Sequence, residues 1–163
     1  MATLKEDIKK QSDWIIKAFA ADKLKLDYTI HSFIEIDKFF NKHSKNGQPV
    51  KRGRLSNNLG PIIFSIGAYV WETIIKTLPK SVWQTDDKNP EGEFAASIKL
   101  QDETIIWPMQ RVLNRFKNGS EDSIYVYGHE ITKDKTKEPF DQNYWDIDKI
   151  PNTPASKPWW KFW

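Results

Sequence analysis

Apolar residues recur at helical spacing in the first part of the chain. Between residues 5 and 21, apolar side chains such as Ile8 and Ile15 are separated by charged residues, which predicts a helix with one apolar face. A second helix is predicted over residues 27–42, where apolar residues follow one another at steps of three, three and four. Asp27 is expected to cap its N-terminus. We expect both helices to be half-buried.

The most apolar stretch, Asn58 to Leu78, predicts a third helix that is enclosed on nearly all sides. Asn58 is its expected N-cap, and Pro61 fits in the first turn, where its missing N–H costs nothing. Gly60 and Gly67 share one stripe and would let a neighbouring backbone approach closely. Another stripe is polar and consists of Ser65, Tyr69, Glu72 and Lys76. The stretch falls short of the roughly 20 apolar residues that a membrane span needs, so we expect a buried helix and no span.

After Ser81 the apolar residues alternate with polar ones, as in a strand that covers a core on one side. Residues 94–100 show this two-residue period, residues 104–107 are a second short candidate strand, and residues 82–85 supply a third. Polar turn residues connect these segments. The pattern therefore predicts a small three-stranded antiparallel sheet.

Two further helices are predicted after the sheet. Pro108 opens the first, which should end at a left-handed C-cap formed by Asn118-Gly119. Ser120 is the expected cap of the second, which runs to about Thr132. Residues 124–131 also alternate, so a strand stays open there.

Residues 133–163 differ in kind from the rest of the chain. They contain four prolines and four of the eight tryptophans, which indicates an irregular tail with aromatic anchors. The last anchors are Trp159, Trp160 and Trp163. They are expected either to fold back on a groove of the same domain or to bind a partner or a membrane surface. The predicted architecture is α+β: residues 1–132 form one domain of helices around a central buried helix with a three-stranded sheet, and residues 133–163 form the tail.

Composition excludes several kinds of chemistry. The chain has 163 residues and no cysteine, which removes disulfides, cysteine-ligated metals and thiol catalysis. The three histidines show neither a metal-ligand spacing nor a catalytic motif, and the glycines form no phosphate-binding loop. We therefore expect no metal, no cofactor and no catalytic residue. The charged N-terminus lacks the apolar run of a secretion signal, which favours a cytoplasmic protein.

Charge is distributed unevenly along the chain. Residues 1–56 carry 12 basic and 7 acidic side chains, whereas residues 57–132 carry 7 and 10. Much of the basic charge lies in residues 42–54, a predicted solvated loop that leaves nucleic-acid binding open as a further alternative. The acidic residues gather in predicted loops and could steer a basic protein partner. Those proposed for partner binding are Asp86, Asp87, Glu91, Glu93, Asp102 and Glu103.

Glu72 is the carboxylate that most needs an explanation, because a charge on a buried helix must be paired, hydrogen-bonded or neutralised. Lys76 follows one turn later, and Tyr69 offers a hydroxyl one turn earlier. One interpretation is a structural ion pair. The other is a pocket in which these residues, with Arg111 or Arg115 from a later helix, bind a polar ligand.

Several motifs occur in the order seen in a known group of proteins. They include Gly67-Ala68-Tyr69-Val70-Trp71-Glu72 in the third helix and Asn118-Gly119-Ser120-Glu121-Asp122-Ser123 after the fourth. They also include Leu26-Asp27-Tyr28, His31-Ser32-Phe33, Ile36-Asp37, Leu59-Gly60, Trp83, Pro108, Arg111-Val112, Arg115 and Ile124. Over residues 26–127 the chain resembles small bacterial domains of unknown function with a GxYxGE-like helix and an NGxEDS-like turn. It departs from that pattern at Trp71, where the group has glycine.

The resemblance implies a fold and a setting, since such domains are similar in size and context to immunity and accessory proteins of bacterial toxin and secretion systems. The leading hypothesis is therefore a non-catalytic protein that binds another protein, such as an immunity protein that neutralises a cognate toxin. The alternatives are a small-ligand binder or enzyme with a pocket around Glu72, and nucleic-acid binding through residues 42–54.

Overall fold

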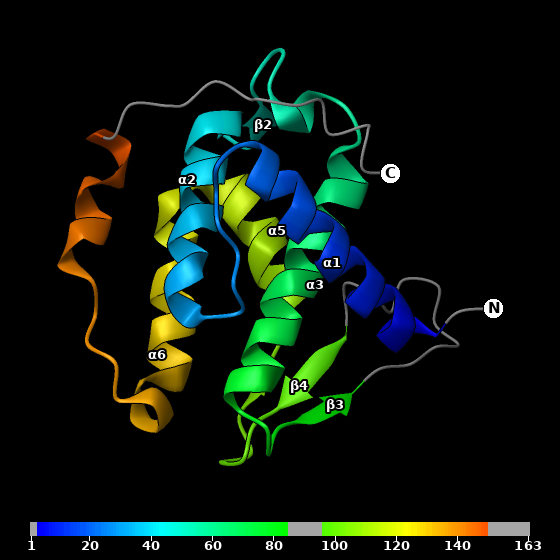
Figure 1. The fold of residues 1–163 in the computed structure, drawn as a ribbon, viewed down its shortest axis with the longest axis vertical. Helices are drawn as coiled ribbons and strands as arrows, with labels where there is room; N and C mark the ends of the chain where they lie inside the picture. The colour runs from blue at the N-terminus through cyan, green and yellow to red at the C-terminus, as the bar shows by residue number, and fades with distance from the viewer. Residues whose placement is uncertain (1–2, 85–95, 150–163) are drawn as a thin grey trace.

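The computed structural model describes residues 3–84 and 96–149, whose helices pack around one central helix beside a small sheet (Figure 1). The α-helices are α1 (Leu4–Ala21), α2 (Phe33–His43), α3 (Leu59–Thr77), α5 (Pro108–Asn118) and α6 (Ile124–Thr136). Short 3-10 helices are η1 (Ile30–Ser32), η2 (Arg54–Ser56), η3 (Ser120–Asp122) and η4 (Gln142–Lys149). The strands are β1 (Ser44–Lys45), β2 (Gln48–Pro49), β3 (Val82–Gln84), β4 (Ser97–Lys99) and β5 (Ile105–Ile106). The predicted α+β class is confirmed.

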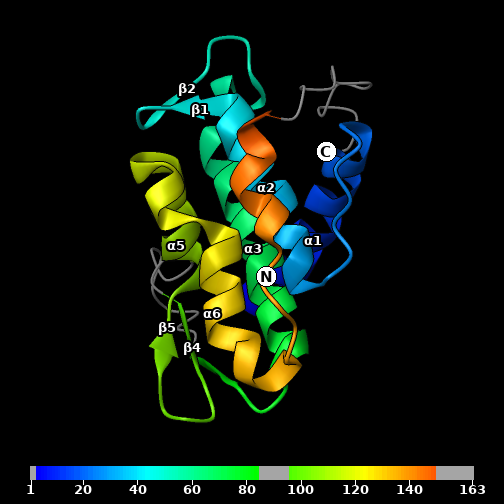
Figure 2. The same cartoon turned by 90° about the vertical axis from the view of Figure 1, so that its left-hand side faces the viewer.

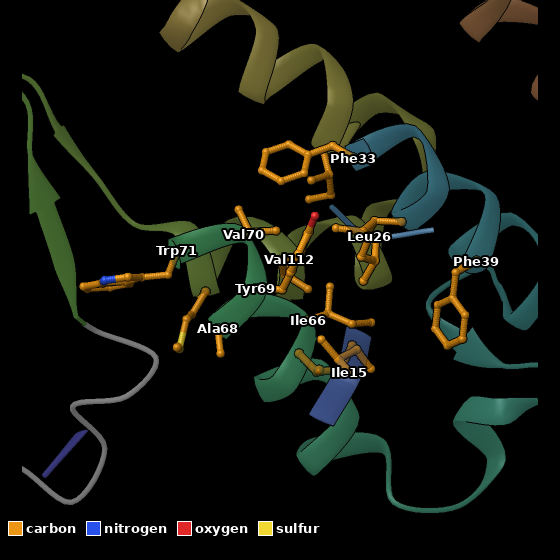
Figure 3. Packing of buried hydrophobic residues seen from close by; sticks show 14 of the residues in the cluster. Ile15, Leu26, Phe33, Phe39, Ile66, Ala68, Tyr69, Val70, Trp71 and Val112 are labelled. Carbon is orange, nitrogen blue, oxygen red and sulfur yellow. The ribbon is translucent and has the colours of Figure 1, made fainter. Parts of the chain in front are cut away.

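Helix α3 is the centre of the molecule, as its apolar composition predicts. It lies between α1 and α5 (Figure 2), and its side chains from Ser65 to Trp71 are all buried. Tyr69 and Trp71 are fully buried in the cluster drawn in Figure 3. A Cβ added at Gly67 would lie 3.0 Å from the Met109 side chain, so the absence of a side chain lets α5 approach closely. By length and composition α3 could also cross a membrane, but 61% of its most apolar window is buried inside the fold.

The beginning of α2 differs from the prediction. The helix starts at Phe33, six residues after Asp27, because Tyr28 adopts a positive φ of 61° that a helix cannot accommodate. The Asp27 carboxylate accepts hydrogen bonds from the N–H and the hydroxyl of Thr29 instead of capping α2. Thr29 in turn caps the short helix η1 by accepting from the Ser32 N–H. Asp27 thus shapes a turn ahead of the helix.

The expected basic loop at residues 42–54 is more ordered than predicted. Helix α2 extends to His43, and β1 then pairs with β2 in a tight antiparallel hairpin. Asn46 and Gly47 form its turn with φ values of 53° and 73°, the combination that a two-residue hairpin turn requires. The long-loop interpretation is therefore wrong for this segment.

Helix α3 begins where the sequence predicts, but the cap works differently. Asn58 is the cap residue with φ 58°, and its side chain makes no capping hydrogen bond. Its carbonyl accepts the first helical bond from the Ile62 N–H at 3.1 Å. Asn58 thus acts through its backbone: asparagine tolerates the left-handed conformation that turns the chain into the helix.

The predicted three-stranded antiparallel sheet is present in the order β3-β4-β5. Its strands are shorter than the alternating segments that predict them. In β4, Ile98 faces Trp83 of β3 and Ile106 of β5. The sheet covers the lower end of α3 in Figure 1.

The turn between α5 and α6 corrects two predicted caps. Gly119 follows α5 with φ 86°, as a C-cap glycine should, but its ψ of −153° is not left-handed helical. Ser120 does not cap the last helix, because residues 120–122 form η3. The cap of α6 is Ser123, whose hydroxyl accepts from the Val126 N–H at 3.1 Å. The competing strand interpretation for this segment is wrong.

The chain past residue 132 still belongs partly to the body of the fold. Helix α6 continues to Thr136, so the boundary predicted at 132 falls inside a helix. Helix η4 then lies against α2, where Tyr144 is buried, while Trp145 is 63% exposed. The tail anchors Trp159, Trp160 and Trp163 lie outside the described residues.

Candidate functional site

Tyr69, the first residue of the predicted pocket, is part of a structural network. Its hydroxyl accepts from the Tyr28 N–H at 2.8 Å and lies 2.6 Å from Ser32 Oγ. Ser32 donates its own proton to the Thr29 carbonyl, so Tyr69 donates to Ser32. Burial raises the pKa of Tyr69, which keeps it protonated as a donor. Its hydroxyl therefore holds the turn before α2.

Glu72 and Lys76 continue the same stripe of α3 toward the surface. Glu72 is half-buried, and burial raises the pKa of its carboxyl group, while the positive charges of Lys76 and Lys9 oppose that shift. The Lys76 ammonium lies 4.9 Å from the centre of the Tyr28 ring. Tyr28 also stacks on Tyr69, so Tyr69 and Lys76 meet at one ring. Burial raises the pKa of Tyr28, and the Glu72 charge lies near enough to add to that rise.

The two arginines expected in that pocket are engaged elsewhere. The Arg115 guanidinium bonds the carboxylate of Asp37 at 2.8 Å, and both side chains are almost completely buried. The Arg111 guanidinium bonds Asp122 at 2.9 Å. The five predicted binding residues therefore do not form one pocket: three lie around Tyr28 and two serve other contacts.

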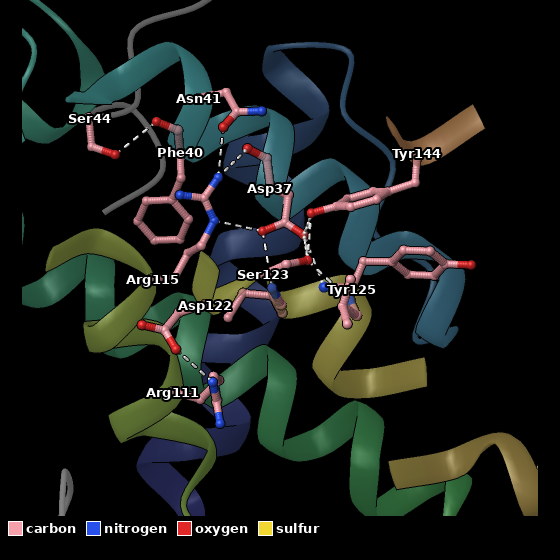
Figure 4. Close-up of polar contacts among 12 residues, drawn as sticks. Asp37, Phe40, Asn41, Ser44, Arg111, Arg115, Asp122, Ser123, Tyr125 and Tyr144 are labelled. Atoms are coloured by element: carbon pink, nitrogen blue, oxygen red, sulfur yellow. Dashed lines mark hydrogen bonds and ion pairs between the residues drawn. The ribbon is translucent and has the colours of Figure 1, made fainter. Parts of the chain in front are cut away.

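The contacts of Arg115 belong to a polar cluster around Asp37 that we call the Asp37 hub (Figure 4). Asp37 is fully buried in α2 and accepts five hydrogen bonds of 2.8–3.1 Å. The donors are Arg115 Nε, the hydroxyls of Ser123 and Tyr144, and the backbone N–H groups of Ile124 and Tyr125. The hub joins α2, α5, α6 and η4.

The chemistry of the hub explains why a charge is tolerated in the interior. The carboxylate receives two N–H groups from the first turn of α6, where the positive end of the helix dipole favours a negative charge. The other hydrogen bonds of the Arg115 guanidinium are with Asn41 Oδ1 at 2.7 Å and the Asp37 carbonyl at 3.3 Å. Burial and the nearby Asp37 charge raise the pKa of Tyr144. Every group is held by another, so we interpret the hub as structural.

A different surface offers groups that are open to a partner. A groove of about 250 Å³ lies beside the outer strand of the sheet. It is lined by Ile105, Ile106, Trp107, Gln110, Arg111, Asn114 and Tyr127. We call this surface the β5 face. Ile105 is 42% exposed and Trp107 is 49% exposed, although both are large and apolar.

Arg111 gives the β5 face its rigid polar element. Its guanidinium carbon lies 4.6 Å from the centre of the Tyr127 ring, in cation–π geometry. The ion pair with Asp122 holds the same side chain from the other side. Burial raises the pKa of Tyr127, so its hydroxyl stays protonated. A fixed arginine, a tyrosine and an exposed tryptophan thus stand side by side.

The predicted acidic loops are described only in part. Asp102 and Glu103 are exposed in the turn between β4 and β5, at the end of the strand that carries the β5 face. The Asp102 carboxylate accepts from the Thr104 N–H, and Glu103 forms an ion pair with Lys99. Asp86, Asp87, Glu91 and Glu93 lie outside the described residues.

The histidines serve local contacts. His43 is buried, and its Nδ1 accepts from the Arg54 N–H at 3.1 Å. Burial, with the charges of Lys42 and Arg54, lowers the pKa of His43 to about 4. His31 lies 2.8 Å from the Asp141 carboxylate. Among the described residues, no group of three His, Asp or Glu side chains converges as metal ligands would.

Sequence reasoning missed both the hub and the β5 face. Asp37 stands on the apolar stripe of α2, between Phe33 and Phe40, where an apolar residue is expected. That misplaced charge was a usable signal for a buried ion pair. At residues 105–107 three apolar side chains follow one another, which a strand with only one buried face does not need. Tyr127 carried no such signal.

Comparisons of this chain with protein-family models, curated proteins and solved structures found no match. The resemblance to small bacterial domains stays a prediction that these comparisons do not test. Trp71 is where the chain departs from the pattern of those domains. Its indole is fully buried and lies 4.9 Å from the Trp83 ring. The indole fills the space that a glycine there would leave open to another segment.

Proposed function

We propose that this chain is a non-catalytic protein that binds another protein through the β5 face. The observation that carries the proposal is the half-exposed Trp107 beside the Arg111–Tyr127 pair. Tryptophan, tyrosine and arginine are the residues that contribute most binding free energy at protein interfaces. An open groove with exposed apolar side chains and a polar rim is typical of such surfaces.

The setting that we propose is that of a bacterial immunity protein, which stays in the cytoplasm and neutralises a toxin by holding it. The support is the motif order found in the sequence together with this surface. Binding of this kind needs neither cofactor nor catalytic group. The acidic turn at Asp102 and Glu103 favours a partner with basic residues near the contact.

The alternatives draw less support from the geometry. A polar-ligand pocket around Glu72 loses the two arginines that would have supplied its cation, because both pair with carboxylates. Nucleic-acid binding through residues 42–54 loses Arg54, which forms an ion pair with Asp22. Single-stranded nucleic acids bind to exposed aromatic rings that lie beside positive charges. Among the described residues, neither region presents that combination.

The test is co-expression of the chain with the products of the genes that flank its own. We expect one flanking product to stop bacterial growth and the chain to restore it, with a one-to-one complex in calorimetry. Trp107→Ala should weaken the complex by tenfold or more, since a truncated hot-spot residue costs about 2 kcal/mol or more. Trp145→Ala is the matched control, because Trp145 is exposed on η4, away from the groove.

Two outcomes would contradict the proposal. In one, no flanking product binds the chain or has its toxicity relieved. In the other, a complex forms but Trp107→Ala binds as tightly as the wild-type chain. The second outcome would leave protein binding intact and remove the β5 face from it.

A further inference from the structure

Among the described residues β5 is the last strand of the sheet in the order β3-β4-β5, so one of its sides pairs with no described strand. The register decides which backbone groups face that side. Leu100 N–H donates to the Thr104 carbonyl, and the next pairs are Lys99 with Ile105 and Ile98 with Ile106. In an antiparallel ladder, hydrogen-bonded pairs alternate with pairs whose N–H and C=O groups point away from each other.

This alternation shows that the backbone N–H and C=O of Ile105 point away from β4. Because Leu100 and Thr104 are hydrogen-bonded, Ile106 bonds to β4, while the N–H and C=O of Ile105 point away from it. The N–H of Trp107 points the same way by the same parity. Among the described residues the Ile105 N–H makes no backbone hydrogen bond outside the sheet, and the register turns it away from β4. This short edge therefore carries unused donors and an unused acceptor at the β5 face.

The groove lies beside these backbone groups. A strand added to an edge places its side chains alternately on the two faces of the sheet. One of them would enter the groove between Trp107 and Tyr127, which suits an apolar group. The side-chain amides of Gln110 and Asn114 bond each other at 3.1 Å. They would contact polar side chains of the added strand next to the one in the groove.

We propose that the partner contributes an extended segment that pairs with Ile105 and Trp107 as a fourth strand. This inference rests on the proposed function and specifies how the partner is held. Main-chain hydrogen bonds supply general affinity in this mode, and the groove selects an apolar side chain. The acidic turn at Asp102 and Glu103 selects a lysine or arginine at the adjoining end of the segment.

The decisive variant is Ile105→Pro, which removes the outward N–H while leaving the bonds between Ile106 and β4 in place. Ile105→Val is the matched control, because it changes the side chain and keeps the N–H. The probe is a phage-displayed library of random decapeptides, selected on the full chain. We expect enriched peptides with apolar residues at alternate positions and one basic end. They should bind the valine variant as the wild type and the proline variant about fivefold to tenfold more weakly, as one lost hydrogen bond predicts.

A measurement on the wild-type chain covers the case in which the proline variant fails to fold. Addition of a selected peptide should slow amide exchange at Ile105 and Trp107 in NMR spectra and leave amides of α1 unchanged. Strand addition is wrong if the peptides bind the proline variant as tightly as the wild type, or if these amides keep their exchange rates. It is also wrong if no peptide is enriched, or if the edge pairs with a second copy, seen as a dimer in sedimentation velocity.

The result separates this inference from the proposed function. If the toxin identified by co-expression needs Trp107 and tolerates Ile105→Pro, the β5 face binds the partner and strand addition is wrong. If the toxin tolerates both changes, the β5 face itself is not the binding surface.

Discussion

The Asp37 hub and the β5 face are both rich in polar and aromatic groups, but they differ in how far those groups are buried and hydrogen-bonded within the chain. In the hub, one buried carboxylate receives five hydrogen bonds from three other elements of the same chain. On the β5 face, Ile105 and Trp107 keep 42% and 49% of their surface exposed. A saturated cluster stabilises the fold, whereas an unsaturated surface is available to a partner. The hub is therefore interpreted as structural, and the β5 face is the surface that we propose for binding.

The largest effect is expected at the hub. Asp37→Ala leaves the Arg115 charge buried without its partner, and such a loss costs about 3–5 kcal/mol of unfolding free energy. Urea denaturation monitored by circular dichroism measures it. Asp141→Ala is the control, because Asp141 pairs with a largely exposed histidine, and it should cost less than about 1 kcal/mol. A loss below 1 kcal/mol for Asp37→Ala would show that the hub does not hold the fold together.

A pH effect of intermediate size is expected from His43. Its pKa is lowered to about 4 in the folded chain, so the unfolded chain binds the proton more tightly. The stability contribution is complete above pH 6.5 and is lost as the pH falls toward 4, up to about 3 kcal/mol. Urea midpoints of the wild type and His43→Gln should converge across this window. Parallel pH profiles for the two proteins would contradict the assignment.

A smaller effect should distinguish the buried Tyr144 from the partly buried Tyr127. Tyr144→Phe removes a hydroxyl that bonds Asp37 at 3.1 Å, and it should cost about 1–2 kcal/mol. Tyr127→Phe removes a hydroxyl for which no hydrogen bond is found among the described residues, so its thermal midpoint should stay close to that of the wild type. Equal shifts in calorimetry would mean that η4 is not anchored through the hub.

The β5 face should respond in binding and hardly in stability. Trp107→Ala should change the unfolding free energy by less than about 1 kcal/mol, because half of the side chain is already exposed. Partner affinity should fall by tenfold or more, which calorimetry of the complex measures. A large loss of stability would place Trp107 with the hub instead.

The smallest effect is expected at Glu72. Its pKa is raised by burial, so the folded chain favours the protonated form and loses stability as the pH rises through that pKa. Glu72→Gln should therefore raise the thermal midpoint slightly at pH 7, by less than about 1 kcal/mol in free energy, and have no such effect at pH 4. A destabilised variant at pH 7 would indicate that attraction to the Lys76 charge outweighs the cost of burying the Glu72 carboxylate.

Local patterns in the sequence predicted the elements well. The apolar run before Leu78 reflects a helix buried on nearly all sides, and the two-residue period after Ser81 reflects a strand buried on one face. Each pattern lies within one segment, so both are readable without the fold. Caps were less predictable, as at Ser120 and Ser123, because several polar residues adjoin and tertiary contacts select among them. Asp27 was misassigned for a similar reason, since it stabilises a turn in place of a helix start.

The site depended on contacts that no local pattern contains. Asp37 and Ser123 are 86 residues apart, and their pairing follows from how α2 meets the start of α6. The sequence interpretation grouped Arg111 or Arg115 with Glu72 in one pocket, whereas in the structure Arg115 pairs with Asp37. The tail was read as irregular from its prolines, although Tyr144 inserts into the body of the fold.

Hydrogen–deuterium exchange of single backbone amides in the free chain tests the contrast most directly. The amides of Ile124 and Tyr125 donate to Asp37 and should exchange only on global unfolding, while Ile106, bonded within the sheet, should be protected as well. Ile105, one residue away from Ile106, should exchange close to the rate of an unstructured peptide. Comparable protection of Ile105 and Ile106, or rapid exchange at Ile124, would contradict the account.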